Sequence, residues 1–298
     1  MKTSKVVQKR IRAYYYEYVK IPLVRKFLFR DLKIKSSTES INLIIENKYS
    51  VSRYGDGELD VIFGGCRGFQ QYDSNLATRL REVLCSNLPN HIVCLPYPFL
   101  DSTFLRNSSN QFWSYYVGMN FKKLLQIINL RKQYYDTEIT RFYIDYKDRS
   151  RCSAHIALLK KIWESRDIII VEGCYTISGT GNDLFNSANS VKRIICPAEN
   201  AYEKYYEILE SVKTNANKEN LILLSLGMTA TVMAYDLASV GLQAIDLGHL
   251  DIEYEWFLNE ADWKIALPNR YVNEVYGGNK VNKCTDPIYL SQIIAQVT

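Results

Sequence analysis

The run Ile168-Ile169-Ile170-Val171 decides the fold class of this chain of 298 residues. It carries no polar residue, and neither does Leu221-Ile222-Leu223-Leu224 further along. Successive side chains of a strand point to opposite faces, so an uninterrupted apolar run indicates a strand buried on both sides. The sequence therefore predicts an α/β fold with a doubly wound, mostly parallel, Rossmann-like sheet covered by helices.

Strands and helices alternate regularly around these two runs. We expect strands at 91–95, 167–171, 193–196, 221–226 and 243–246, and helices at 73–87, 156–165, 183–188, 201–212 and 229–240. Ligands of such sheets bind outside the carboxyl ends of the strands. The loops that follow these strands are therefore the predicted positions of functional residues.

The positive charge of the chain is concentrated at its N-terminus. The formal net charge is +5, yet eleven Lys and Arg residues face only two acidic residues up to Lys35. Aromatic and aliphatic residues alternate with these cations, as in a helix that lies on an anionic membrane. A helix packed on the protein and a nucleic-acid contact are the alternatives. We expect no nucleic acid partner, because the rest of the chain is acidic and would repel a polyanion.

The chain divides into a basic amphipathic segment, 1–38, and a single α/β domain, 39–298. Within the domain, 100–150 is rich in aromatic residues and is interpreted as an acceptor-side insertion with a helix from Gln111 to Leu130. The sequence has no apolar run long enough to span a membrane and no secretory signal. Its seven cysteines lack a Cys-x-x-Cys pair and are interpreted as reduced core residues. These features favour a cytoplasmic protein, peripheral at most to the inner face of the cell membrane.

The segment Ser52-Arg53-Tyr54-Gly55-Asp56-Gly57-Glu58 carries a candidate metal site. Asp56 and Glu58 are two residues apart, and the flanking glycines leave the main chain open to a ligand. Carboxylates of this kind hold Mn²⁺ or Mg²⁺ together with the phosphate oxygens of a substrate, and Arg53 could bind the same phosphates. The alternative is a simple turn, with Asp56 as a helix N-cap and Glu58 in the first helical turn.

Two glycine-containing loops are candidates for substrate binding. Gly227, Thr229 and Thr231 lie where a buried strand passes into a helix, and the free N–H groups of that helix could bind phosphate. The segment from Gly179 through Gly181 to Asn182 and Asp183 follows another strand and could contact a nucleotide. Ordinary strand–helix packing and helix capping are the respective alternatives.

The segment after 243–246 contains the candidate catalytic residues His249, Asp251 and Glu253. A histidine between carboxylates is a suitable general base, and Trp256 could stack on a sugar ring. An acidic helix start with Trp256 in the core is the alternative. Arg141, among tyrosines of the insertion, could bind a phosphate or a sugar, or form a cation–π contact.

Taken in order, these motifs resemble those of the GT-D-fold glycosyltransferases, bacterial enzymes that use sugar nucleotides. The resemblance covers about residues 40 to 280 and implies that Asp56 and Glu58 form an Asp-x-Glu metal motif for Mn²⁺ or Mg²⁺. It also implies transfer of a sugar from a UDP-sugar to a glycan or lipid-linked glycan, in surface polysaccharide or glycoprotein synthesis. The chain departs from the family pattern at Met228 and Phe142, where prolines are usual, and at Ile177, where an arginine is common. A nucleotide-binding module without turnover and a metal-dependent nucleotide-sugar hydrolase remain alternatives.

Overall fold

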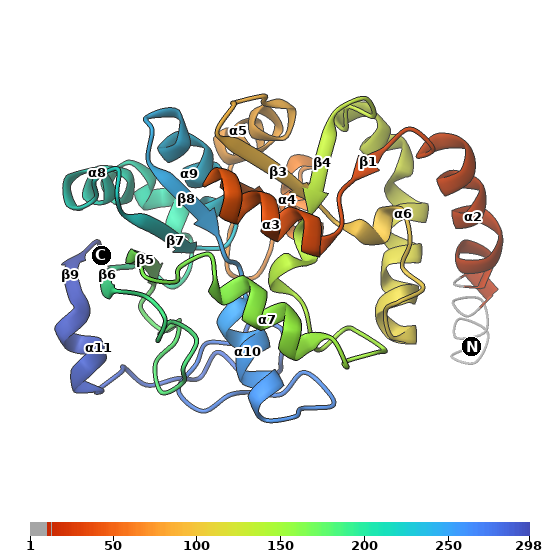
Figure 1. Cartoon of the computed structure of the whole chain (residues 1–298). Coiled ribbons are helices and arrows are strands. Elements are labelled where there is room, and N and C mark those ends of the chain that lie inside the picture. Colours follow the sequence, from red (N-terminus) through yellow and green to blue (C-terminus); the bar gives the residue numbers. More distant parts are fainter. Residues whose placement is uncertain (1–10, 13) are drawn as a thin grey trace.

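A computed structural model describes residues 11–12 and 14–298 and contains one nine-stranded sheet (Figure 1). The strand order is β1-β4-β3-β2-β8-β7-β5-β6-β9, and every pairing within it is parallel. This confirms the predicted α/β class. The strands are β1 (Lys33–Ile34), β2 (Ser50–Arg53), β3 (His91–Leu95), β4 (Gln133–Asp136), β5 (Asp167–Gly173), β6 (Ser190–Cys196), β7 (Leu221–Ser225), β8 (Gln243–Asp246) and β9 (Ile293–Gln296).

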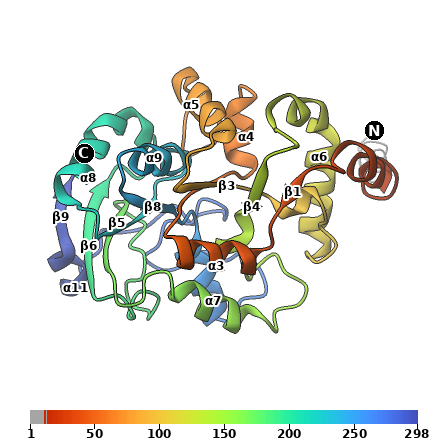
Figure 2. The same cartoon turned by 45° about the horizontal axis from the view of Figure 1, so that its top comes forward.

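Helices cover both faces of the sheet (Figures 1 and 2). The α-helices are α2 (Ile21–Leu23), α3 (Ser37–Asn47), α4 (Asp56–Ile62), α5 (Ser74–Cys85), α6 (Asn107–Ile127), α7 (Cys152–Lys160), α8 (Tyr205–Asn215), α9 (Met228–Ser239), α10 (Leu250–Leu258) and α11 (Pro287–Gln292). Shorter turns are the π-helical η1 (Tyr16–Lys20) and η2 (Val24–Leu28), and the 3₁₀-helical η3 (Tyr97–Phe99), η4 (Thr137–Thr140) and η5 (Ala201–Lys204).

The apolar runs that predict the fold supply both halves of the core. Ile169 and Val171 of β5 pack in one apolar cluster with α4, α5, α6, α8 and α9. Ile168 and Ile170 pack in a second cluster with α3, α7 and α10 on the opposite face. The alternation along a single strand thus joins the sheet to a helical layer on each side.

The described part of the segment 1–38 packs on the domain rather than standing apart from it. Tyr16, Ile21 and Val24 are buried, and the Tyr16 ring lies directly against Gly118 of α6. Phe29 and Leu32 also belong to the main core, and β1 adds a strand beside β4. The sheet and its core thus begin before residue 38, where the sequence predicted the boundary of the N-terminal segment.

The aromatic region 100–150 is also part of the main architecture. It contains α6, four residues earlier at its start than expected, and β4, which the sequence did not indicate. β4 pairs with β3 and β1. No helix of the described residues is both long and apolar enough to cross a membrane. Cys66 and Cys85 are exposed, so the prediction that all cysteines lie in the core is wrong for these two.

Candidate active site

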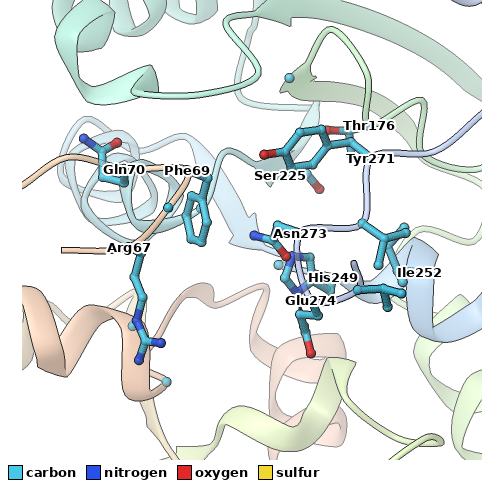
Figure 3. Close-up of a pocket in the computed structure, with 18 of the residues that line it drawn as sticks. Arg67, Phe69, Gln70, Thr176, Ser225, His249, Ile252, Tyr271, Asn273 and Glu274 are labelled. Carbon is cyan, nitrogen blue, oxygen red and sulfur yellow. Dashed lines mark ion pairs between the residues drawn. The ribbon is translucent and has the colours of Figure 1, made fainter. Parts of the chain in front are cut away.

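A cavity of about 1140 Å³ opens at the carboxyl ends of the strands (Figure 3). The turns after β2, β5, β7 and β8 contribute to its wall, as do α6 and the long loop between α10 and α11. This is where ligands bind in open parallel sheets, so the location agrees with the prediction from strand order.

The turn after β2 places the predicted metal motif at the cavity wall. α4 begins at Asp56, and the Glu58 Oε2 atom accepts a hydrogen bond from the Gly55 N–H at 2.7 Å. This is the helix-capping arrangement that was the alternative to a metal site. Arg53, Gly55, Asp56 and Glu58 all line the cavity, so the capped turn also presents the motif to a ligand.

The charges beside this turn leave one carboxylate poorly compensated. Burial raises the pKa of Glu58 to about 7, and the nearby Asp246 carboxylate adds to the shift. Arg53 compensates Glu58 only in part, because its Nε donates to the Asp246 carbonyl at 2.9 Å and its guanidinium reaches the η4 residues Thr137 and Thr140. Asp56 is bonded to Arg67 at 2.5 Å. A cation near Glu58 would relieve the cost of its buried charge.

These residues fit a divalent cation that is shared with a substrate. Among residues 11–12 and 14–298, no three Asp, Glu, His or Cys side chains gather closely enough to hold a metal by themselves. Mg²⁺ and Mn²⁺ are usually held by one or two carboxylates and by phosphate oxygens. Asp56 and Glu58 would supply the two carboxylates. In this structure one Asp56 oxygen accepts a hydrogen bond from Arg67.

The strand–helix junction at Gly227 contributes main chain rather than hydroxyl groups to the cavity. Gly227 has a φ of 55°, and a Cβ there would lie 2.7 Å from the Phe69 ring. Thr229 and Thr231 are fully buried behind it and do not line the cavity. Thr231 donates to the Asp246 carboxylate at 3.1 Å, whereas Thr229 has no hydroxyl partner among the described residues. The predicted hydroxyl contacts to substrate are therefore corrected.

The loop containing Gly179 and Gly181 supports the site from behind. The Gly179 N–H and the Asn182 amide both donate to the Asp251 carboxylate, at 2.7 and 3.2 Å. Asp183 turns outward and bonds Lys160 at 2.7 Å. None of these residues lines the cavity, and 183–188 forms turns in place of the expected helix. Their predicted nucleotide contacts are not present in this geometry.

Of the candidate catalytic residues, only His249 and Asp251 reach the cavity wall. Asp251 is already paired with Arg270 at 2.6 Å. Glu253 is buried and accepts the Tyr143 and Ile144 N–H groups at 3.1 Å. Trp256 is fully buried and donates to the Ile265 carbonyl, so it has no face free to stack on a sugar. Glu253 and Trp256 thus lie behind the wall of the cavity, which corrects their predicted roles.

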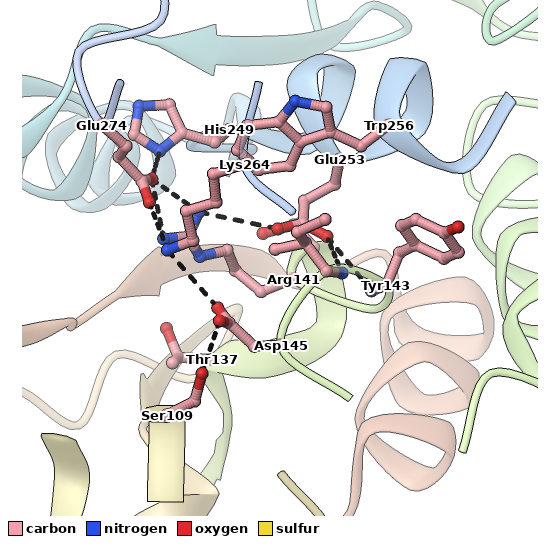
Figure 4. Close-up of polar contacts among 12 residues, drawn as sticks. Ser109, Thr137, Arg141, Tyr143, Asp145, His249, Glu253, Trp256, Lys264 and Glu274 are labelled. Atoms are coloured by element: carbon pink, nitrogen blue, oxygen red, sulfur yellow. Dashed lines mark hydrogen bonds and ion pairs between the residues drawn. The ribbon is translucent and has the colours of Figure 1, made fainter. Parts of the chain in front are cut away.

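A charged network joins His249 to the insertion (Figure 4). The His249 Nδ1 atom lies 2.9 Å from Glu274 Oε1, and the same carboxylate is bonded to Arg141 at 2.7 Å and to Lys264 at 2.6 Å. Burial would raise the pKa of Glu274, but Arg141, His249 and Lys264 outweigh it and hold that pKa well below its usual range. Arg141 is therefore committed to protein carboxylates in this arrangement.

Sequence reasoning missed the loop that closes the cavity. Its residues Tyr271, Asn273 and Glu274 point into the cavity, and Phe69 lies on the facing wall with Arg67 below it (Figure 3). The cluster Tyr271-Val272-Asn273-Glu274-Val275-Tyr276-Gly277-Gly278 is a usable signal, because aromatic, amide and acidic residues followed by two glycines are typical of a binding loop. No strand precedes this loop directly, so the strand-end rule did not point to it.

Comparisons with known proteins identify the family of this chain. The "Glycosyltransferase GT-D fold" family model matches residues 51–275. The probable glycosyl transferase Gly of Streptococcus gordonii is 38% identical over 269 residues, which cover 90% of this chain and 39% of that protein. Glycosyltransferase GlyD of Streptococcus pneumoniae serotype 4 is 35% identical over 267 residues, 89% of this chain and 33% of that protein. The chain thus spans well under half the length of these curated relatives.

Solved structures share the whole fold. A domain of unknown function 1792 described as having a distinct glycosyltransferase fold superimposes with a TM-score of 0.88 at 36% identity, covering 95% of this chain and all of that one. A glycosyltransferase from Streptococcus sanguinis gives a TM-score of 0.85 at 37% identity, covering 90% of this chain and all of that one. The order of motifs, the parallel sheet and these matches lead to one conclusion: the chain belongs to the GT-D-fold family of glycosyltransferases.

Proposed function

We propose that this chain is a metal-dependent glycosyltransferase that moves a sugar from a UDP-sugar to a hydroxyl of a glycan or lipid-linked glycan acceptor. The observation that carries the proposal is the partly exposed, poorly compensated Glu58 beside Asp56 in the wall of a large cavity that His249 also lines. The two carboxylates would hold Mn²⁺ or Mg²⁺, which would neutralise charge on the departing diphosphate.

The protein's own groups would orient the reactants around that diphosphate. Main-chain groups at Gly227 lie beside the Phe69 ring on one side of the cavity, and Tyr271 faces them across it (Figure 3). These two aromatic rings offer apolar surface for the base and ribose of a nucleotide. Donation from His249 Nδ1 to Glu274 leaves Nε2 free to accept a proton from an acceptor hydroxyl.

The exposed surface of the N-terminal segment supports the proposal that the acceptor is carried by a lipid. Tyr16, Ile21 and Val24 face α6, while Tyr18, Leu23 and Phe27 are exposed beside basic residues. An apolar face with flanking cations is typical of proteins that lie on anionic membranes. On this proposal the enzyme acts at the inner face of the cell membrane, in the synthesis of a bacterial surface glycan or glycoprotein.

Calorimetric titration with UDP and UDP-glucose, with and without Mn²⁺, tests the proposal. We expect binding of UDP and UDP-glucose to require Mn²⁺. Asp56→Asn and Glu58→Gln should each abolish this metal-dependent binding, while the thermal unfolding temperature stays close to that of the wild type. Glu46→Gln, at an exposed position of α3, is the control for loss of one negative charge. Tight UDP binding without metal would favour a nucleotide-binding module. Release of free sugar at an unchanged rate when acceptor is added would favour a hydrolase.

A further inference from the structure

Glu138 is a buried carboxylate that faces the cavity without a partner. Its side chain is 5% exposed, it lines the cavity, and neither carboxylate oxygen forms a hydrogen bond or an ion pair with any residue that the structure describes. Its position is fixed, because its own N–H donates to the Asp136 side chain at 2.9 Å at the start of η4. A carboxylate that lines a cavity without a protein partner marks a position that a ligand can complete.

The nearest cation is already occupied. Arg141, three residues further on, donates through both terminal nitrogens to Glu274 at 2.7 Å. Burial raises the pKa of Glu138 well above its ordinary value, and the Asp136 charge adds to the shift. The Arg141 charge offsets this shift only in part, and a hydroxyl group is a ligand that satisfies the carboxyl in either protonation state.

The surroundings of Glu138 suit a sugar ring. Asp145 lines the same cavity and accepts from the Ser109 hydroxyl at 2.7 Å (Figure 4). Phe112 and Trp113 of α6 also line it, and Phe112 is 47% exposed. Carboxylates that accept from hydroxyls, next to an aromatic surface, are complementary to the polar edge and apolar face of a sugar.

The local charge excludes an anionic ligand. Asp136, Asp145 and Glu253 all act on Glu138 with the same negative sign, and Arg141 is shared among the carboxylates. A phosphate placed here would be repelled, whereas an uncharged hydroxyl would not. In the function proposed above, the donor diphosphate lies at the turn after β2, near Asp56 and Glu58, and not at Glu138.

We propose that Glu138, with Asp145 and the aromatic residues of α6, forms the subsite for the terminal, uncharged sugar ring of the acceptor. This inference rests on the proposed function, since only a transferase needs an acceptor sugar. It assigns to Glu138 a hydrogen bond to a hydroxyl of that ring. Any phosphate of a lipid carrier then lies outside this subsite.

Saturation-transfer NMR tests the subsite without requiring turnover. The chain is saturated with UDP and Mg²⁺, and methyl glucoside, N-acetylglucosamine and glucose 6-phosphate are added as separate probes. We expect wild type to bind at least one neutral probe and to bind the phosphorylated probe more weakly. Glu138→Gln should weaken binding of the neutral probe about tenfold, because an amide nitrogen, which cannot accept a hydrogen bond, replaces one of the two carboxyl oxygens, while the affinity for UDP stays within about twofold.

Glu46→Gln is the matched control and should bind every probe as wild type does. The unfolding temperature of Glu138→Gln should equal or exceed that of wild type, because a buried, unpaired carboxyl is removed. The inference is overturned by equal binding of the neutral probes to Glu138→Gln and wild type, by no binding of any neutral probe, or by a preference for glucose 6-phosphate. A clear fall in the unfolding temperature would also overturn it, since the protein would then pair Glu138 internally. If wild type shows no metal-dependent binding of UDP, the proposed function itself is refuted.

Discussion

The Nδ1 atom of His249 lies 2.9 Å from the Oε1 atom of Glu274, although His249 precedes α10 and Glu274 belongs to the loop after it. The carboxylate is held there by Arg141 and Lys264 and can only accept a hydrogen bond. His249 must therefore carry its proton on Nδ1 when the ring is neutral, with Nε2 available to the cavity. Glu274 thus orients the His249 ring and fixes which of its nitrogens carries the proton.

Nitrogen-15 NMR of the imidazoles tests this tautomer. The chain has three histidines, so the signals can be assigned by single substitutions. At alkaline pH we expect His249 to be in the Nδ1–H form in wild type. Glu274→Ala should move it towards the Nε2–H form, and Glu46→Gln should leave it unchanged. An Nε2–H signal in wild type would contradict the hydrogen bond described here.

His249→Ala tests the chemical role of the ring in the proposed reaction. We expect the transfer rate to fall by ~10²–10⁴-fold, the size typical of losing a general base. Affinity for the UDP-sugar should change little, because His249 is placed on the β8 side of the cavity and away from the Phe69 ring. Steady-state kinetics with varied donor separates the two effects. Lost UDP binding with normal turnover at saturating donor would make His249 a nucleotide contact.

Gly248→Ala tests how closely the β8 turn fits Arg53. Gly248 has a φ of 53°, and a Cβ at this position would collide with the Arg53 guanidinium. We expect a loss of stability of about 2 kcal/mol or more, from backbone strain and the collision together. Gly64→Ala is a matched control, because its φ is 89° and nothing lies near its Cβ position. Equal losses in urea unfolding of the two variants would mean that the contact with Arg53 contributes nothing.

Glu253 makes the stability of the protein depend on pH. Burial raises its pKa to about 7, so the native state binds more protons than the unfolded state between about pH 4 and pH 7. The free energy of unfolding should therefore fall as pH rises through that window. Glu253→Gln should lack this fall. The free energy of unfolding of Glu253→Gln minus that of wild type, measured by urea unfolding, should therefore rise by on the order of 3 kcal/mol from pH 5 to pH 8. A constant difference between the two proteins would refute this origin of the pH dependence.

The outward face of the N-terminal segment can be tested without disturbing its inward face. Tyr18→Ser combined with Phe27→Ser should weaken binding to vesicles that contain anionic lipid, at low salt, and leave donor hydrolysis unchanged. Removal of the whole segment is not a clean test, because Ile21, Phe29 and Leu32 are core residues. Unchanged sedimentation with vesicles would remove the support for a membrane role.

The fold class was predictable because an uninterrupted apolar run within one strand is enough to indicate a buried parallel sheet. The runs at 168–171 and 221–224 are apolar on both faces, and the structure places each in an interior strand of the sheet. The sequence did not reveal β4 or β1, because tyrosine, glutamine and lysine side chains break the apolar pattern of these two strands. β1 is an edge strand and β4 lies next to it, and strands near the edge of a sheet have less to bury, so their sequences carry a weaker signal.

The site was less predictable than the fold. Proximity to a strand end correctly brought Arg53, Asp56, Glu58 and His249 to one cavity. The same rule could not tell which side chain of a loop points outward, so Thr231, Asp183 and Trp256 were placed at the ligand although they bond or pack elsewhere. Glu274 and Glu138 were missed because their roles depend on contacts between distant loops, which spacing in sequence does not encode.

The central pairing of the sheet governs when the site can form during synthesis. β2 lies beside β8, and the Ala244 N–H donates to the Ser50 hydroxyl, 194 residues earlier in the chain. Such distant pairings make folding slow, since a long loop must close before the contact gains anything. The segment with Asp56 and Glu58 therefore leaves the ribosome long before β8 exists, and until then one edge of β2 and one edge of β7 stay unpaired. A truncated product that ends before β8 would lack both His249 and the strand next to β2, so on the proposed function it could not consume the donor.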